Sequence, residues 1–244
     1  MKFADIHTHA LFGVDDGAKN FDDMFKMIDA AYSSGTRIIC FTPHYIPELF
    51  KNNSEAAEKA FAAAKEYSGK KYKDLFLFLG NELRYNASGV QWLKEGFCRT
   101  LNGSKCVLVD FPSDENAKSI CDAMNSLLSA GYIPVLAHTE RYAALGGKAE
   151  TVQQLKDRGV IVQIDAGSVF GQWGFGSKIR CRKLLSKHLA DIAASDAHNT
   201  SSRPPEMSEF YEFAKNKYSK RYADDICFYN TLKILGADAE KKAE

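Results

Sequence analysis

Short runs of apolar, β-branched and aromatic residues recur along the chain, and most are followed by a longer stretch with helical spacing. Short apolar runs bounded by turn residues are typical of buried strands, whereas apolar residues three and four positions apart are typical of amphipathic helices. We predict strands at residues 3–6, 37–42, 75–79, 105–111, 133–137, 160–165 and 191–194. We predict helices at residues 21–33, 55–67, 115–129, 151–158, 177–187 and 205–218.

The predicted strands and helices alternate, which gives about seven βα units in a row. This order predicts an α/β fold with a parallel sheet, either open or closed into a barrel. Asn20 is suited to cap the start of the first helix. Gly35, Gly131 and Gly159 lie where left-handed caps at helix C-termini belong.

Composition indicates one globular domain. Of the 244 residues, 45% are hydrophobic and 26% are charged, which are ordinary values for a chain that buries a sizeable core. Barrel enzymes of this length commonly form a single domain. We expect one domain at residues 1–236, followed by a frayed C-terminal tail of small and charged residues at 237–244.

Charge and targeting signals narrow the expected partners and compartment. The 32 Lys and Arg residues nearly balance the 31 Asp and Glu residues, so no overall field attracts nucleic acid or an anionic membrane. No signal-like segment is found, and no run of about 18 apolar residues occurs that would insert directly into a membrane. The six cysteines are scattered without a Cys-x-x-Cys pair, which is typical of reduced thiols. We therefore expect a cytoplasmic protein.

Histidines and carboxylates gather at one end of the predicted strands. Five of the six histidines lie within or just after strand C-termini, and carboxylates occupy equivalent positions. A lone histidine is more often a hydrogen-bonded structural residue, but the C-terminal ends of parallel strands all emerge at one face. These side chains are therefore expected to converge on one cavity: His7, His9, His44, His138 and His198, with Asp16, Glu82, Asp110, Asp165 and Asp196.

The donor types predict a metal centre that acts on phosphate esters. His7 and His9 are two positions apart in an extended segment, so their imidazoles point to the same side and suit capture of one ion. Mixed imidazole and carboxylate donors favour Mn, Fe or Zn, and more than about six donors imply more than one metal. Cations held close together can produce a hydroxide and neutralise charge on a phosphoryl group. Arg141 and Arg203 follow two of the histidines closely and are suited to grip phosphate oxygens.

Eight ordered motifs carry a family resemblance that extends to about residue 205. They are D-I-H-T-H at 5–9, D-D-G at 15–17, T-P-H-Y at 42–45, E-L-R at 82–84, F-P at 111–112, A-H-T-E-R-Y at 137–142, D-A-G-S at 165–168, and S-D-A-H-N at 195–199 with R-P-P at 203–205. In order and spacing they resemble the bacterial tyrosine phosphatases of the PHP (polymerase and histidinol phosphatase) family, which are associated with capsule and exopolysaccharide synthesis.

The resemblance implies a single distorted (β/α)7 barrel of the PHP type, with about two or three divalent cations, most often manganese, with iron or zinc as alternatives. It implies hydrolysis of phosphotyrosine on a bacterial tyrosine kinase that regulates polysaccharide export, by a metal-bound hydroxide and without a covalent phosphoenzyme. Arg141 and Arg203 would be the catalytic phosphate clamps. The metal ligands would be His7, His9, Asp16, His44, Glu82, Asp110, His138, Asp196 and His198. We expect a monomer or small oligomer.

The chain departs from this family pattern at three positions. Asp110 stands where Glu is usual and is one methylene shorter, which bears on whether three metal sites fill. Thr139 stands where Pro is usual and relaxes the backbone. Asp165 stands where Asn is more common, and its added charge either anchors a loop, draws a metal or repels an anionic substrate. The sequence leaves these roles of Asp165 open.

Other functions remain open at this stage. The wider PHP superfamily includes histidinol-phosphate phosphatases and other small-molecule phosphoesterases with similar ligands. A non-catalytic metal-binding partner of the kinase is a further alternative. A cysteine-based phosphatase would need Cys with Arg about six positions later, a spacing that no cysteine here has. Tyr45, Trp173 and Phe175 fall in loops near the predicted mouth, where we expect them to form walls for a phenyl ring.

Overall fold

The computed structural model describes residues 1–50, 53–146, 148–236, 239 and 241. Its strands are β1 (Phe3–Asp5), β2 (Thr36–Phe41), β3 (His44–Tyr45), β4 (Phe76–Leu79), β5 (Glu82–Arg84), β6 (Cys106–Asp110), β7 (Ile133–Leu136), β8 (Ile161–Asp165) and β9 (Ile192–Ala194). The seven predicted strands are all present, and each end agrees within one residue. The short strands β3 and β5 were not predicted.

Helices follow most of the strands. They are α1 (Phe21–Ser33), α2 (Asn53–Lys71), α3 (Gly89–Lys94), α4 (Ala117–Ser129), α5 (Ala143–Gly146), α6 (Ala149–Asp157), α7 (Gly174–Ser186), α8 (Ser208–Lys217), α9 (Lys220–Asp224) and α10 (Asn230–Leu235). Short 3-10 or π turns are η1 (Leu101–Gly103), η2 (Thr139–Arg141), η3 (Ala166–Phe170) and η4 (Asp225–Tyr229). The six predicted helices are confirmed as α1, α2, α4, α6, α7 and α8.

The predicted helix caps are also present. The Asn20 side chain accepts a hydrogen bond from the Asp23 amide at 2.9 Å, which satisfies one of the free N–H groups at the start of α1. Gly35, Gly131 and Gly159 all adopt positive φ at helix C-termini. Each lies immediately before a strand or within one residue of it, so the left-handed turn directs the chain back into the sheet.

The strands form a curled parallel sheet. Two sets of strands pair in the orders β1-β2-β4 and β3-β5-β6-β7-β8-β9, and the neighbours in both sets are parallel. β3 and β5 continue β2 and β4 beyond a bend. The Gly80 amide donates to the Phe41 carbonyl at 2.8 Å and the Glu82 amide to the Pro43 carbonyl at 3.1 Å, so pairing continues through that bend. A Cβ at Gly80 would lie 2.9 Å from Leu101, which explains the glycine.

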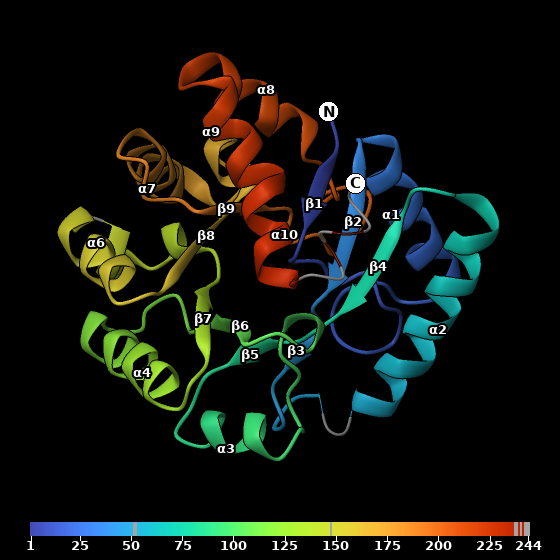
Figure 1. Cartoon of the computed structure of the whole chain (residues 1–244), viewed down its shortest axis with the longest axis horizontal. Coiled ribbons are helices and arrows are strands. Elements are labelled where there is room, and N and C mark those ends of the chain that lie inside the picture. Colours follow the sequence, from blue (N-terminus) through green and yellow to red (C-terminus); the bar gives the residue numbers. More distant parts are fainter. Residues whose placement is uncertain (51–52, 147, 237–238, 240, 242–244) are drawn as a thin grey trace.

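The first and last strands meet beyond their C-terminal ends. Thr8 and Ala197 form a parallel bridge, and the His9 amide donates to the Ala197 carbonyl at 2.8 Å. In Figure 1 the strands lie inside, and helices α1, α2, α3, α4, α6, α7 and α8 surround them. The predicted α/β class with a parallel sheet is confirmed, and the sheet is strongly curled.

Alternate residues of the strands fill the interior of the curled sheet. Ala4, Ile38, Leu108 and Ile192 are buried in one apolar cluster, as the two-residue period of a strand requires. The same cluster includes three residues of α10, which is labelled near the centre of Figure 1: Leu232, Ile234 and Leu235.

The chain from α9 through α10 closes the N-terminal end of the sheet, and it was missed by the pattern analysis. The Asn230 side chain donates to the carbonyl of Asp191, the residue just before β9, at 2.9 Å. The opposite, C-terminal end of the strands is therefore the end at which a site is accessible. The predicted tail at 237–244 falls mostly on residues outside the described part of the chain.

The strand residues that point away from the interior of the sheet pack against the surrounding helices. Val107, Val109 and Val162 belong to a cluster that includes buried residues of α4, α6, α7 and α8. Ile39 and Phe41 pack with α1 and α2 in a third cluster. Among the described residues, no helix has the length and apolar character needed to cross a membrane.

Candidate metal centre

All nine predicted metal ligands come together at the C-terminal end of the strands. His7 and His9 follow β1, His44 opens β3, Glu82 opens β5 and Asp110 ends β6. His138 follows β7, Asp196 and His198 follow β9, and Asp16 lies in the loop between β1 and α1. The convergence predicted from strand order is therefore present in the structure.

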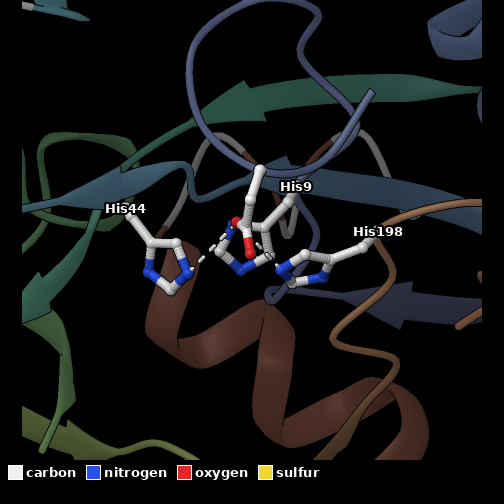
Figure 2. Close-up of side chains that lie close together, drawn as sticks. His9, His44 and His198 are labelled. Atoms are coloured by element: carbon white, nitrogen blue, oxygen red, sulfur yellow. Dashed lines mark ion pairs between the residues drawn. The ribbon is translucent and has the colours of Figure 1, made fainter. Parts of the chain in front are cut away.

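The donor atoms form overlapping groups. In each group, one atom from every residue lies within 4.8 Å of the others: His9, Asp16, His44 and His198; His7, His9 and Glu82; His7, His138 and Asp196; His44, Glu82 and Asp110. Figure 2 shows the rings of His9, His44 and His198 gathered at one point, and the ring centres of His9 and His198 are 4.0 Å apart. Because the groups share residues, they are suited to hold several ions side by side.

Glu82 is the hub of the cluster. Its Oε1 lies 3.1 Å from His138 Nε2 and 3.3 Å from His7 Nε2. Its Oε2 lies 2.6 Å from His44 Nδ1 and 3.4 Å from His9 Nε2. Ligands that bind one ion at about 2.1 Å lie about 3 Å or slightly more from one another, so these separations suit ligation.

The histidines of the first strand are oriented through Nδ1. His9 Nδ1 lies 2.7 Å from Asp15 Oδ2, and His7 Nδ1 lies 3.2 Å from Gln163 Oε1. The Nε2 atoms of His7, His9 and His198 are buried and have no hydrogen-bond partner among the described residues. A histidine that uses Nδ1 for an outer hydrogen bond and leaves Nε2 inward has the arrangement typical of a metal ligand. These orphaned nitrogens show that the residues fit a metal.

Asp15 and Gln163 support the cluster; Asp15 belongs to the D-D-G motif but had no predicted role, and Gln163 was not predicted at all. Asp15 also accepts the amide hydrogen of His44 at 2.9 Å, and Gln163 accepts that of His138 at 2.8 Å. Each side chain therefore links two histidines. Asp15 adjoins the predicted ligand Asp16, whereas Gln163 lies within β8 and carries no sequence signal that separates it from a buried strand residue.

Electrostatics also favour a cation at this position. Burial alone would lower the pKa of His7, but the carboxylates of Glu82 and Asp196 raise it to about 9. Burial would raise the pKa of Glu82, yet His44 and His7 hold it well below its usual value. The carboxylates thus stay ionised and the centre of the cluster stabilises positive charge. The donor set contains imidazole and carboxylate but no thiolate, which suits a hard or borderline divalent ion.

Two donors adopt strained backbone conformations. His138 has φ 32° and Asp196 has φ 50°, in the left-handed region that costs residues with a Cβ about 1–2 kcal/mol. Strain of this kind gathers at functional sites, where surrounding structure holds it in place. Thr139, the departure next to His138, donates its hydroxyl to the Leu136 carbonyl at 3.0 Å and begins the turn η2.

Arg141 and Arg203 lie together beside the donors. Arg141 Nη2 forms ion pairs with Asp165 and Asp196, and Arg203 Nη2 lies 2.7 Å from Asp196 Oδ2. Both guanidinium groups lie against the Trp173 ring, with Cζ to centroid distances of 3.5 and 4.7 Å. The Nε atoms of both arginines have no hydrogen-bond partner among the described residues. The pair is thus fixed in place by its ion pairs and by the Trp173 ring.

A cavity of about 450 Å³ opens onto these groups. It is lined by His44, Glu82, Arg84, Asp110, Phe111, Pro112, Ser113, Asp114, His138, Arg141, Tyr142, Trp173, Asp196, His198 and Arg203. Cavities that bind small ligands commonly measure about 300–1,000 Å³. The arginines, six of the nine metal donors and three aromatic rings therefore face one open cavity.

Arg84 is a third arginine at the cavity, and its position was not predicted. Its Nε donates to Asp110 Oδ2 at 2.5 Å, while the Tyr142 hydroxyl donates to Asp110 Oδ1 at 3.2 Å. Asp110 Oδ1 also lies 3.5 Å from His138 Nε2. The short side chain of Asp110 therefore still reaches the donor cluster, and Arg84 and Tyr142 fix its orientation.

Of the predicted aromatic walls, only Trp173 lines this cavity among the described residues. Phe175 is 77% exposed, and Tyr45 packs edge-on against Trp92 with ring centres 5.3 Å apart. Loop position alone was a poor guide, because the direction of each side chain depends on the packing of its neighbours.

Replacement of Trp173 by Ala should raise KM for aryl phosphates by about tenfold, and for alkyl phosphates by a smaller factor. The ring would contribute contact with a phenyl group and cation–π support to two arginines, each worth about 1 kcal/mol. Steady-state kinetics on matched phenyl and alkyl phosphates measures both. Equal rises in KM for the two substrates would contradict the role of Trp173 as a phenyl wall.

Comparison with known proteins gives consistent matches over nearly the whole chain. The family described as "Capsular polysaccharide synthesis, CpsB/CapC" matches residues 3–236. Tyrosine-protein phosphatase CpsB of Streptococcus agalactiae serotype V is 33% identical over 236 residues, which is 95% of this chain and 97% of that protein. Tyrosine-protein phosphatase YwqE of Bacillus subtilis is 33% identical over 199 residues, which is 82% of this chain and 78% of that protein.

Solved structures agree with these matches. A crystal structure from work on YwqE of Bacillus subtilis and CpsB of Streptococcus pneumoniae, described as metal-dependent tyrosine phosphatases, has a TM-score of 0.81 and 29% identity. It covers 91% of this chain and 90% of its own. A variant organophosphorus hydrolase from Deinococcus radiodurans has a TM-score of 0.57 at 11% identity, over 96% of this chain and 92% of its own, which is a likeness of fold alone.

Proposed function

This chain belongs to the CpsB/CapC family of capsular polysaccharide synthesis proteins, and on that premise we propose that it is a metal-dependent protein-tyrosine phosphatase. The observation that carries this proposal is a cluster of nine imidazole and carboxylate donors, six of which line one cavity together with Arg141 and Arg203. The substrate is phosphotyrosine on a protein, and the partner is a bacterial tyrosine kinase that regulates capsule or exopolysaccharide synthesis.

Arg141 and Arg203 bind the phosphoryl group. Their guanidinium groups face the cavity from the same side, and the Trp173 ring beneath them restricts their movement. Guanidinium groups fixed before the substrate arrives stabilise the charge that develops on phosphoryl oxygens without reorganising during the reaction. Phe111 and Tyr142 line the same cavity and offer apolar contact to the phenyl ring of the substrate.

The residues that would hold metal are His7, His9, Asp16, His44, Glu82, Asp110, His138, Asp196 and His198. We propose about two or three divalent cations per chain, with manganese as the native ion and iron or zinc as competitors. Bound cations of this kind supply water activation at neutral pH and neutralise phosphoryl charge. Gln163 and Asp15 hold the imidazoles in the orientation that ligation needs.

The fold supports a more specific proposal, the (β/α)7 barrel of the PHP type. Counting β2 with β3 and β4 with β5 as single bent strands leaves seven strand positions, and the bridge between Thr8 and Ala197 joins the first position to the last. The domain is proposed to span residues 1–236, in keeping with the family match at 3–236. A cytoplasmic location and a monomer or small oligomer complete the proposal.

Phosphate release from a phosphotyrosyl peptide should depend on manganese, stop with a chelator, and exceed release from histidinol phosphate. Both substrates would be assayed with one purified preparation by phosphate detection, with and without metal. If the protein preferred histidinol phosphate, the proposed metal centre would stand but the proposed substrate would be wrong. Absence of metal-dependent turnover on either substrate would contradict the proposal and favour a non-catalytic metal-binding partner.

A further inference from the structure

Asp165 is the one carboxylate of the predicted convergence that lies outside the donor groups among the described residues. It ends β8 and its side chain is fully buried. One carboxylate oxygen, Oδ2, pairs with Arg141 Nη2, and the other, Oδ1, accepts from Gln163 Nε2 at 3.2 Å. Asp165 therefore acts on the arginine clamp rather than on a metal.

The charges of the clamp are balanced before any substrate binds. Arg141 pairs with both Asp165 and Asp196, and Arg203 pairs with Asp196. Two guanidinium groups are thus matched by two carboxylates. Asp196 differs from Asp165 because its Oδ1 faces the imidazoles of His7 and His9 at 3.4 Å, so its charge is shared with the donor cluster.

A phosphate group that binds Arg141 therefore meets a guanidinium that already has a buried anionic partner. Asp165 and Asp196 both pair with Nη2, whereas Nε makes no hydrogen bond among the described residues. Two anions that share one guanidinium in a site of low dielectric repel each other, which weakens the binding of the second. This repulsion acts on every phosphate in the site, whether substrate or product.

We propose that Asp165 competes with bound phosphate for Arg141 and thereby limits product inhibition by inorganic phosphate. The proposal rests on the phosphatase function proposed above. Free phosphate depends on the clamp and the cations for its binding, whereas a phosphotyrosyl substrate also has the aromatic contacts of the cavity. Asp165 weakens both by the same factor, so the substrate, which binds more tightly through its aromatic contacts, still occupies the site at concentrations at which free phosphate no longer does. Asp165 is a positioning and specificity residue and takes no part in bond making.

Asp165→Asn tests this proposal because it keeps the shape of the side chain and an oxygen for Arg141 while it removes the charge. In manganese-loaded protein, the inhibition constant of inorganic phosphate should fall about tenfold, as should KM for p-nitrophenyl phosphate, while kcat changes by less than about twofold. An unchanged or higher inhibition constant would overturn the proposal. A role limited to anchoring Arg141 would instead raise KM and lower kcat together.

Glu140→Gln is the matched control, with all variants assayed at about pH 8, because burial and the neighbouring Asp165 raise the pKa of Glu140 to about 7 and its charge is present above that pH. Glu140 is a fully buried carboxylate next to Asp165, and its Oε1 accepts from the Asp165 amide at 3.1 Å and from the Ser168 hydroxyl at 2.5 Å. It forms no ion pair with Arg141 among the described residues. The phosphate inhibition constant of this variant should stay within about twofold of the wild-type value. A fall equal to that of Asp165→Asn would show a general charge effect and contradict the specific competition.

A binding measurement separates this inference from the proposed function. The chain has two tryptophans, and Trp173 lies 3.5 Å below the Arg141 guanidinium, so Trp92→Phe leaves its fluorescence as a reporter of the clamp. Titration with inorganic phosphate should give about tenfold tighter binding after Asp165→Asn in this background. Wild-type protein without phosphatase turnover would refute the proposed function. Active protein with equal phosphate affinity in both forms would refute only the role of Asp165.

Discussion

Glu82→Gln is expected to lower phosphatase turnover by about 10³-fold or more and to reduce the metal content of the purified protein. Glu82 has both oxygens within 3.4 Å of the nitrogens of four histidines from three segments of the chain, and it belongs to two of the four donor groups. An amide carries no charge and offers one oxygen, and the loss of metal-derived stabilisation amounts to several kcal/mol. Kinetics on a phosphotyrosyl peptide and elemental analysis of metal per chain measure the two effects.

The control for this prediction is Glu140→Gln, which makes the same chemical change at a buried carboxylate outside the donor groups. It should keep the wild-type metal content. Circular dichroism establishes that both variants fold. If Glu82→Gln retained its metals and its turnover within about tenfold of wild type, Glu82 would not be the shared ligand of the centre.

Arg203→Ala should reduce kcat/KM by about 10²- to 10³-fold while the metal content stays unchanged. Fixed donors to phosphoryl oxygens in a partly dehydrated site typically contribute this much. Its partner Asp196 keeps Arg141 as an ion pair, so the variant leaves no buried carboxylate without a cation. If the variant lost its metal or kept full turnover, Arg203 would not be a phosphate clamp.

Arg141→Ala should cause a similar loss of activity but a larger loss of stability. It leaves Asp165 fully buried without its ion-pair partner, and breaking a buried pair from one side typically costs about 3–5 kcal/mol. Urea unfolding would measure that cost. The double variant Arg141→Met with Asp165→Asn should regain most of the stability and none of the activity. If the double variant regained activity as well as stability, Arg141 would stabilise the fold and would not bind the phosphate.

Much of the fold was predictable because its strands are buried and apolar. Runs such as residues 105–111 and 160–165 have a composition that favours strands in any parallel sheet. β3 and β5 lack that signal because they are two and three residues long and contain His44, Glu82 and Arg84. Their strand conformation comes from pairing with each other and with β6, which is tertiary information.

The C-terminal helices were missed for a related reason. η4 and α10 bury residues toward the interior of the sheet, including Phe228, Leu232 and Leu235. Their role in closing the end of the sheet depends on contacts with residues far away in sequence. For example, the Asn102 side chain donates to the Leu235 carbonyl at 2.9 Å.

The donors were predictable from topology, whereas their supports were not. A residue just after the end of a parallel strand has its location set by the fold, which is why strand order predicts the positions of His138 and Asp196. Gln163, Asp15 and Arg84 act through the direction of a side chain toward a particular neighbour. Strand order does not determine that direction. The structure also shows that Asp165 pairs with Arg141. The sequence had left open whether Asp165 anchors a loop, draws a metal or repels an anionic substrate.

The pairing of the first strand with the last has a consequence for how the protein is made. The Ser195 hydroxyl donates to the Asp5 carboxylate at 2.5 Å across a separation of 190 residues, and Thr8 bridges to Ala197. A nascent chain emerges from its N-terminus, so His7 and His9 leave the ribosome long before Asp196 and His198. Until then the segment that follows β1 lacks its partner around Ala197, and the donor set is incomplete. Metal insertion is therefore a late step of biogenesis, after nearly the whole chain has been translated.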